Sequence, residues 1–138
     1  MWSLVAAMTV KLNHTIVHSK DPVAAADFYS GVFALPAPVR FGPFLDVDVA
    51  NEVTLAFLSA GDMDVQTQHY AFLVSEAEFD LIFARVKERG LPYWADPVKG
   101  HRGEINRHDG GRGVYFDDPS GHLLEIITRP YGSGGLTL

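Results

Sequence analysis

The same strand–helix pattern occurs twice in this chain, and this repetition limits the folds that it can adopt. An alternating apolar segment that contains His14 is followed by a helix-like run, and an equivalent pair of segments begins near His69. The two histidines are 55 residues apart, and Pro36 and Pro92, which follow the two helix-like runs, are 56 residues apart. The near-equal spacing predicts a tandem duplication of one structural unit.

Each expected helix begins with a capping signal. Asp21 is a good N-cap before Pro22, a residue that is favoured at the first position of a helix. Ser75 and Glu78 form a capping-box pattern before the second periodic run. The strands expected around these two helices cover residues 12–18, 39–41, 45–49, 53–58, 68–74, 93–95, 112–116 and 122–128.

These elements predict an α+β fold made of two tandem βαβββ modules. Module one covers about residues 11–60, a linker covers 61–67, and module two covers about 68–129. A half of roughly 60 residues cannot easily bury both faces of its own sheet. We therefore expect residues 1–138 to form a single domain, in which the modules build one curved mixed sheet around a cup, with the helices outside.

Composition and charge limit the kinds of partner that the chain can bind. The chain has 11 basic and 17 acidic residues, a formal charge of −6, which argues against nucleic acid as a ligand. No apolar run reaches the roughly 20 residues of a membrane span, so we expect a cytoplasmic protein with a small-molecule substrate and no membrane partner. Residues 1–7 are expected to be an extension before the fold, with Met8 as an alternative start. Because the chain has no cysteine, any metal must be held by His, Asp or Glu.

Three side chains are expected to face the cup. Strand alternation turns His14 and His69 away from the helices, in equivalent places of the two modules, and Glu125 lies within the apolar last strand. An unpaired buried carboxylate costs several kcal/mol. Two histidines and one carboxylate form the facial triad of divalent-metal sites. The alternative for Glu125 is an exposed edge position or an ion pair with Arg112 or Arg129.

The sequence resembles the vicinal oxygen chelate superfamily, which includes glyoxalase I, fosfomycin-resistance proteins, bleomycin-binding proteins and extradiol dioxygenases. The resemblance implies that His14, His69 and Glu125 are the ligands of a cup-shaped metal site and that the protein is a homodimer. Fe(II) or Mn(II) is the favoured ion, with Zn(II) and Ni(II) as alternatives. The resemblance spans about residues 11–129 and is carried by the motifs Asn13-His14, Asp27-Phe28-Tyr29, Gln68-His69 and the stretch from Tyr115 to Glu125.

The C-terminal part is also similar to the signature of extradiol dioxygenases, through residues 106–108 and 114–125. In those enzymes a histidine and a tyrosine near the metal donate hydrogen bonds or protons, and the resemblance assigns these roles to His108 and Tyr115. His18, two residues after His14 on the same strand face, is a third catalytic candidate. The resemblance thus favours a metal-dependent, extradiol-type ring-cleaving dioxygenase that acts on a catechol-like substrate.

Two departures from the family keep alternatives open. The strand at residues 53–58 has no titratable side chain, whereas ring-cleaving relatives commonly place a histidine there and glyoxalase I a fourth ligand. The Lys and Ser-rich loop expected of fosfomycin-modifying enzymes is also not found. The alternatives are a glyoxalase-like isomerase or lyase acting on an α-hydroxycarbonyl compound, and a metal-free small-molecule-binding protein of the bleomycin-resistance type. The three candidate ligands favour an enzyme over the binding protein.

Overall fold

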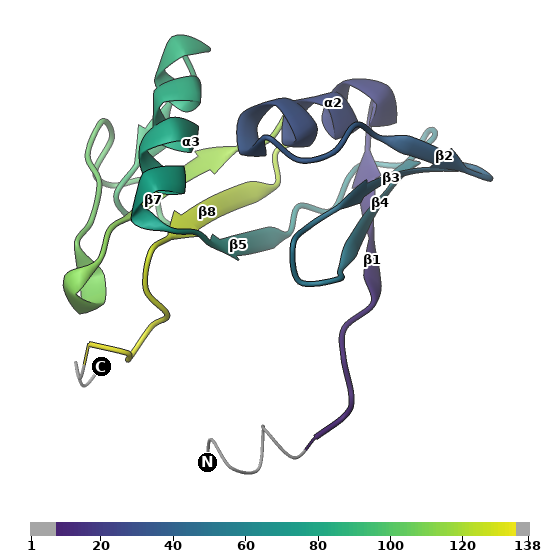
Figure 1. The fold of residues 1–138 in the computed structure, drawn as a ribbon. Helices are drawn as coiled ribbons and strands as arrows, with labels where there is room; N and C mark the ends of the chain where they lie inside the picture. The colour runs from purple at the N-terminus through teal and green to yellow at the C-terminus, as the bar shows by residue number, and fades with distance from the viewer. Residues whose placement is uncertain (1–7, 135–138) are drawn as a thin grey trace.

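The computed structural model of the chain describes residues 8–134, so the extension expected at residues 1–7 lies outside the described residues. Within the described part, the chain forms a strand, a helix and three strands, and then repeats this order (Figure 1). The elements are β1 (His14–Ser19), α2 (Pro22–Phe33), β2 (Val39–Phe41), β3 (Phe44–Asp48), β4 (Thr54–Ser59), β5 (His69–Leu73), α3 (Glu76–Glu88), β6 (Tyr93–Trp94), the short 3-10 turn η1 (His108–Gly110), β7 (Gly113–Asp117) and β8 (Leu123–Ile127).

Both predicted helix starts are confirmed. The Asp21 carboxylate accepts a hydrogen bond from the backbone N–H of Ala24, and Pro22 begins α2. Ser75 and Glu78 form both bonds of the capping box at the start of α3. These bonds satisfy backbone N–H groups that have no partner inside the helix. Neither described helix has the length and apolar character needed to cross a membrane.

The strands form two four-stranded sheets, in the orders β1-β4-β3-β2 and β5-β8-β7-β6. In each sheet the first pair is parallel and the other pairs are antiparallel. The α+β class and the two tandem βαβββ modules are thereby confirmed. The sheets differ from the single continuous sheet that we expected, because among the described strands β1 and β5 do not hydrogen-bond to each other.

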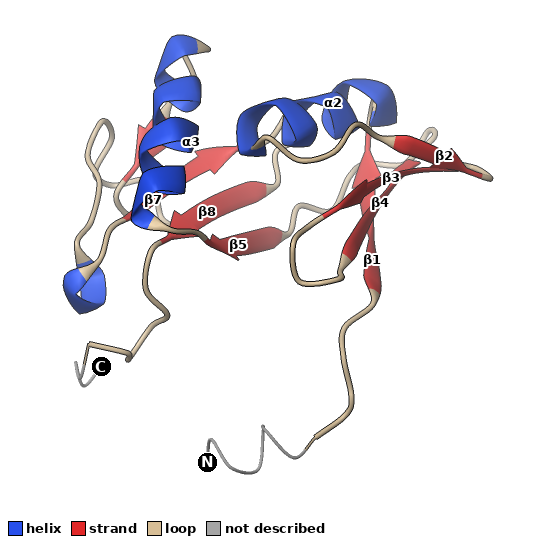
Figure 2. Cartoon of the chain, viewed as in Figure 1, coloured by secondary structure: helices blue, strands red, loops and turns tan. Residues whose placement is uncertain are grey.

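The helices join the two modules instead. Phe33 of α2 places its ring 4.5 Å from that of Phe72 on β5, a strand of the other module. The Arg85 side chain of α3 donates a hydrogen bond to the Val32 carbonyl of α2. Both helices lie on one side of the sheets (Figure 2), so the shared core lies between the helices and the sheets.

The sheet faces turned away from the helices are open. On β1 the side chain of Ile16 is 42% exposed, and on β5 that of Leu73 is 62% exposed. Val17, the neighbour of Ile16, is fully buried because alternate residues of a strand point to opposite faces. The faces that carry the candidate ligands are therefore the solvent-facing sides of both sheets.

A buried carboxylate fixes the turn before β8. One oxygen of Asp118 accepts hydrogen bonds from the backbone N–H groups of Ser120 and His122, at 2.8 and 2.9 Å. The other accepts the Tyr29 hydroxyl of α2 at 2.7 Å. Burial raises the pKa of Tyr29, so the hydroxyl remains a donor. This contact ties the start of β8, the strand that carries Glu125, to the helix of module one.

Candidate metal centre

Glu125 and His69 lie side by side on the open face of the second sheet. In the parallel pair β5–β8, Glu125 is opposite Ala71 and His69 is opposite Leu123. Glu125 Oε1 is 3.0 Å from Nε2 of His69. The carboxylate is 1% exposed, whereas the His69 side chain is 45% exposed. The pair therefore has one buried and one accessible member.

The hydrogen bonds of His69 suit a metal ligand. Its Nδ1 lies 2.9 Å from the carbonyl oxygen of Leu123, which can only accept, so Nδ1 carries the proton. In the neutral ring, Nε2 then presents a lone pair to the Glu125 oxygen, and a proton or a metal ion has to lie between them. An imidazole that donates its other N–H to a carbonyl is typical of metal-ligating histidines. His69 and Glu125 therefore supply two donor groups of the kind that divalent ions bind, and a complete site needs at least one more.

The alternative ion pair of Glu125 with Arg112 is wrong. The Arg112 guanidinium faces α3 and pairs with Glu76 and Asp80, with nitrogen–oxygen distances of 2.8 Å for both. No Lys or Arg in residues 8–134 forms a salt bridge with Glu125. A proton, a metal ion or hydrogen bonds must therefore stabilise this buried carboxylate.

Two tyrosines complete the surroundings of Glu125. The Tyr131 hydroxyl donates a hydrogen bond to Oε2 of Glu125 and lies 2.9 Å from the Tyr115 hydroxyl. The Tyr115 ring stacks on His69, with a centroid distance of 5.9 Å. Burial, followed by the bond to Tyr131, raises the pKa of Tyr115, and burial, followed by the bond to Glu125, raises that of Tyr131. Both groups are therefore protonated phenols that can donate.

His108 lies at the edge of this cluster. It begins η1, is exposed, and its ring centroid is 6.5 Å from that of Tyr131. The structure thus places Tyr115 beside His69 and Glu125, and His108 one residue further away. The catalytic roles of Tyr115 and His108 stay predictions.

His14 lies on the other sheet. It is exposed on β1, beside an open hollow of about 290 Å³ whose walls include Ile16, Phe41 and Phe44. Its Nδ1 is 2.8 Å from the side-chain oxygen of Asn13, so Nε2 carries the free lone pair, as in His69. Residues 8–134 contain no group of three His, Asp or Glu side chains close enough to hold a metal. The convergence of His14, His69 and Glu125 within one chain is therefore not found.

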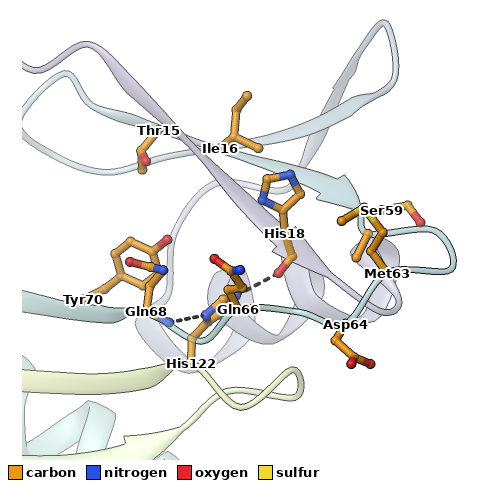
Figure 3. Close-up of a pocket in the computed structure, with 11 residues that line it drawn as sticks. Thr15, Ile16, His18, Ser59, Met63, Asp64, Gln66, Gln68, Tyr70 and His122 are labelled. Carbon is orange, nitrogen blue, oxygen red and sulfur yellow. Dashed lines mark hydrogen bonds between the residues drawn. The ribbon is translucent and has the colours of Figure 1, made fainter.

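His18 lines a different hollow, of about 660 Å³, at the junction of the modules (Figure 3). Its backbone carbonyl accepts a hydrogen bond from Nε2 of the buried His122, at 2.8 Å. Nδ1 of His122 accepts one from the backbone N–H of Gln68, at 2.9 Å. The described lining of this hollow does not include His69 or Glu125, so the structure does not bring His18 to that pair.

The bond from His122 to the His18 carbonyl joins the two modules, and the loss of His122 is expected to destabilise the fold. Changing His122→Leu leaves the Gln68 N–H and the His18 carbonyl without partners, which should lower the free energy of unfolding by about 2–4 kcal/mol. Urea unfolding followed by circular dichroism measures this change. The matched control is His101→Leu at an exposed position, where less than about 0.5 kcal/mol is expected. Equal stabilities for the two variants would contradict the role of His122.

Sequence reasoning did not single out His122 and Tyr131 as important. His122 directly follows a turn glycine, and only the packing of the two modules brings its side chain to the backbone carbonyl of His18. Tyr131 lies six residues beyond Glu125, after the last strand, where no alternating pattern predicts which way its side chain points. The sequence offered one signal for Tyr131: this residue, whose side chain carries a hydroxyl, directly follows Pro130 and lies close in sequence to the candidate ligand Glu125.

The fold and this cluster define a class of protein. Residues 11–126 match the family model described as Glyoxalase/Bleomycin resistance protein/Dioxygenase superfamily, and the chain belongs to this superfamily. The resemblance seen in the sequence is thereby confirmed.

Particular relatives differ in similarity. The solved structure of Oxidase ChaP-H1 is 57% identical, with a TM-score of 0.87, and the match covers 90% of this chain and 99% of that one. Oxidase ChaP-H2 is 55% identical, with a TM-score of 0.90, over 93% of this chain and 100% of that one. Metallothiol transferase FosB of Shouchella clausii (strain KSM-K16) is 30% identical over 85% of this chain and 79% of its own length. These relatives are named as enzymes, which supports an enzyme here.

Proposed function

We propose that this chain is a divalent-metal-dependent oxidase that uses dioxygen on a catechol-like substrate, with extradiol-type ring cleavage as the expected reaction. The proposal of a metal site depends on one observation, the surroundings of the buried Glu125 carboxylate. An imidazole nitrogen of His69 lies 3.0 Å from Oε1, and no Lys or Arg in residues 8–134 forms a salt bridge with this carboxylate. Imidazole and carboxylate together suit Fe(II) and Mn(II), with Zn(II) and Ni(II) as alternatives.

The relatives support oxidation over the other chemistries of the superfamily. The two oxidases share 57% and 55% identity with this chain over nearly all of their length, against 30% for the metallothiol transferase. Because function depends on the site rather than on the fold, the Glu125 cluster is the second support for a metal-dependent oxidase. Isomerase or lyase chemistry and metal-free binding become outcomes of the test below.

We further propose that a second copy of the chain supplies the third ligand. His14 has a free Nε2 lone pair on an open sheet face, and His69 with Glu125 lies on the open face of the other sheet. The apolar side chains around them, including Phe41 and Leu73, are 71% and 62% exposed in the single chain. A two-fold dimer that faces the first sheet of one copy with the second sheet of the other would cover these side chains and create two identical sites.

The residues of the chain then have distinct tasks. When bound, a divalent ion acts as a Lewis acid for two neighbouring substrate oxygens. His14, His69 and Glu125 would hold that ion. Tyr115, a buried phenol stacked on His69, would donate a hydrogen bond to a substrate oxygen when that oxygen replaces its present acceptor, the Tyr131 hydroxyl. We assign to His108, an exposed residue at the edge of the cluster, the exchange of a proton between the site and solvent.

The test is anaerobic reconstitution with Fe(II), followed by oxygen-uptake measurements with a panel of catechols. We expect about one Fe(II) per chain and one dioxygen consumed per substrate, with the yellow absorbance of a ring-opened product. Stoichiometric metal without oxygen uptake would contradict the oxidase and favour the isomerase or lyase alternative. Protein that binds a catechol without any metal would favour the binding protein. Fosfomycin with a thiol is the control reaction, for which no turnover is expected.

A further inference from the structure

We propose that Tyr131 is a positioning residue that holds Glu125 so that one carboxylate oxygen, Oε1, is presented to the metal. This inference rests on the proposed function, because it assigns a role within the same site. It adds a residue from outside the two repeated modules, on the segment that follows β8.

The two oxygens of Glu125 have different partners. Oε1 is 3.0 Å from Nε2 of His69, whereas Oε2 accepts the hydroxyl proton of Tyr131. A carboxylate can bind a metal through one or both oxygens. When Oε2 is held by a phenol, binding through Oε1 alone is favoured, and a coordination position stays available for the substrate. Hydrogen bonds to ligating carboxylates are a general way in which proteins orient metal ligands.

The direction of the hydrogen bonds is determined by proton count. A phenol has one proton, and Tyr131 uses it toward Glu125, whose oxygen accepts. The Tyr115 hydroxyl, 2.9 Å from that of Tyr131, must therefore donate to the Tyr131 oxygen. The result is a chain of donors from Tyr115 through Tyr131 to Glu125. Such chains strengthen each bond by polarisation.

The backbone around Tyr131 holds it in place. The C-terminal segment runs beside η1 (Figure 1), where the Gly134 N–H donates to the Asp109 carboxylate at 3.1 Å. A Cβ at Gly134 would lie 2.6 Å from the Asp109 backbone, so the close approach requires glycine. Within the segment, the Arg129 guanidinium donates to the Ser133 carbonyl at 3.1 Å, and this bond closes a short loop that contains Tyr131.

The exposure of Tyr131 argues for a role beyond packing. Its side chain is 49% exposed, so the ring adds little to the core, and the hydroxyl is the part that contacts other polar groups. Changing Tyr131→Phe should therefore preserve the fold while releasing Oε2. Glu125 could then bind the metal through both oxygens or turn away from it.

The test compares the wild type and Tyr131→Phe by Co(II) titration, with calorimetry and visible absorption as readouts. We expect Tyr131→Phe to bind Co(II) about 10- to 100-fold more weakly and to show weaker visible bands, because a second carboxylate oxygen raises the coordination number. Gly134→Ala, which must displace the segment without touching Glu125, is expected to weaken binding as well. The matched control is Tyr93→Phe on β6, where neither Co(II) affinity nor spectrum should change.

Two results would be decisive in different ways. Equal Co(II) affinities and spectra for wild type and Tyr131→Phe would overturn the role of Tyr131 and leave the metal site intact. A wild-type protein that binds no stoichiometric Co(II) would instead overturn the proposed metal site, and the role of Tyr131 with it.

Discussion

Changing Glu125→Gln is expected to abolish metal binding and turnover. The amide is neutral and presents one weak oxygen donor, whereas the carboxylate supplies the negative charge that a divalent ion needs in a buried place. Loss of partners of metal ligands alone lowers affinity 10- to 100-fold, so loss of a ligand should exceed about 100-fold. Metal analysis of the purified variant after dialysis, with oxygen uptake on the catechol panel, measures both effects.

A surface carboxylate provides the control for this experiment. Glu76, which pairs with Arg112 on the helix side of the second sheet, is changed to glutamine in parallel. Glu76→Gln should retain stoichiometric metal and wild-type turnover, because it lies outside the Glu125 cluster. If Glu125→Gln kept its metal as well, the proposed centre would have to lie elsewhere in the chain.

Two inactive variants are expected to restore activity when they form one dimer. His14→Ala and His69→Ala should each lose nearly all turnover, since each removes a ligand from both sites of its homodimer. In a heterodimer of the two variants, one site contains both lesions, and the other contains none. We expect about half of the wild-type activity per heterodimer, which follows from two-fold symmetry. Co-expression with two different N-terminal tags, sequential affinity purification and oxygen uptake provide the measurement.

The control heterodimer combines His69→Ala with Glu125→Gln. Both lesions then fall on the second module, so each of the two sites has one, and no activity should return. A site built within a single chain makes a different prediction for the first pair, because no chain in that heterodimer has all three ligands and activity would stay absent. An inactive His14→Ala and His69→Ala heterodimer would therefore refute the shared site.

The secondary structure was largely readable from local chemistry. Asp21 with Pro22, and Ser75 with Glu78, place the two helix starts because capping depends on neighbouring residues only. The duplication was visible because His14 and His69 hold the same place in two repeats. The separation into two sheets was not predictable, since it depends on whether β1 and β5 pair at their edges, and both have the alternating pattern of half-buried strands.

The candidate site was predicted in part for the same reason. Strand register brings His69 next to Glu125. The alternation of side chains along each strand correctly predicted that both point away from the helices. The position of His14 depends on how one module lies relative to the other, which no local pattern encodes. Tyr131 depends on the path of the segment after β8, which is set by the close approach of Gly134 to Asp109.

The ring of Phe33 packs against the second module, with its centroid 4.5 Å from that of the Phe72 ring and 6.1 Å from that of the Phe116 ring. A duplicated gene whose halves fold independently is free to accumulate changes in either copy. Here a substitution at Phe33 alters the packing against β5, and thereby the position of His69 on that strand. We therefore expect the two halves of this chain to be coupled at this aromatic contact, so that a chimera that takes one half from a distant relative should need compensating changes there.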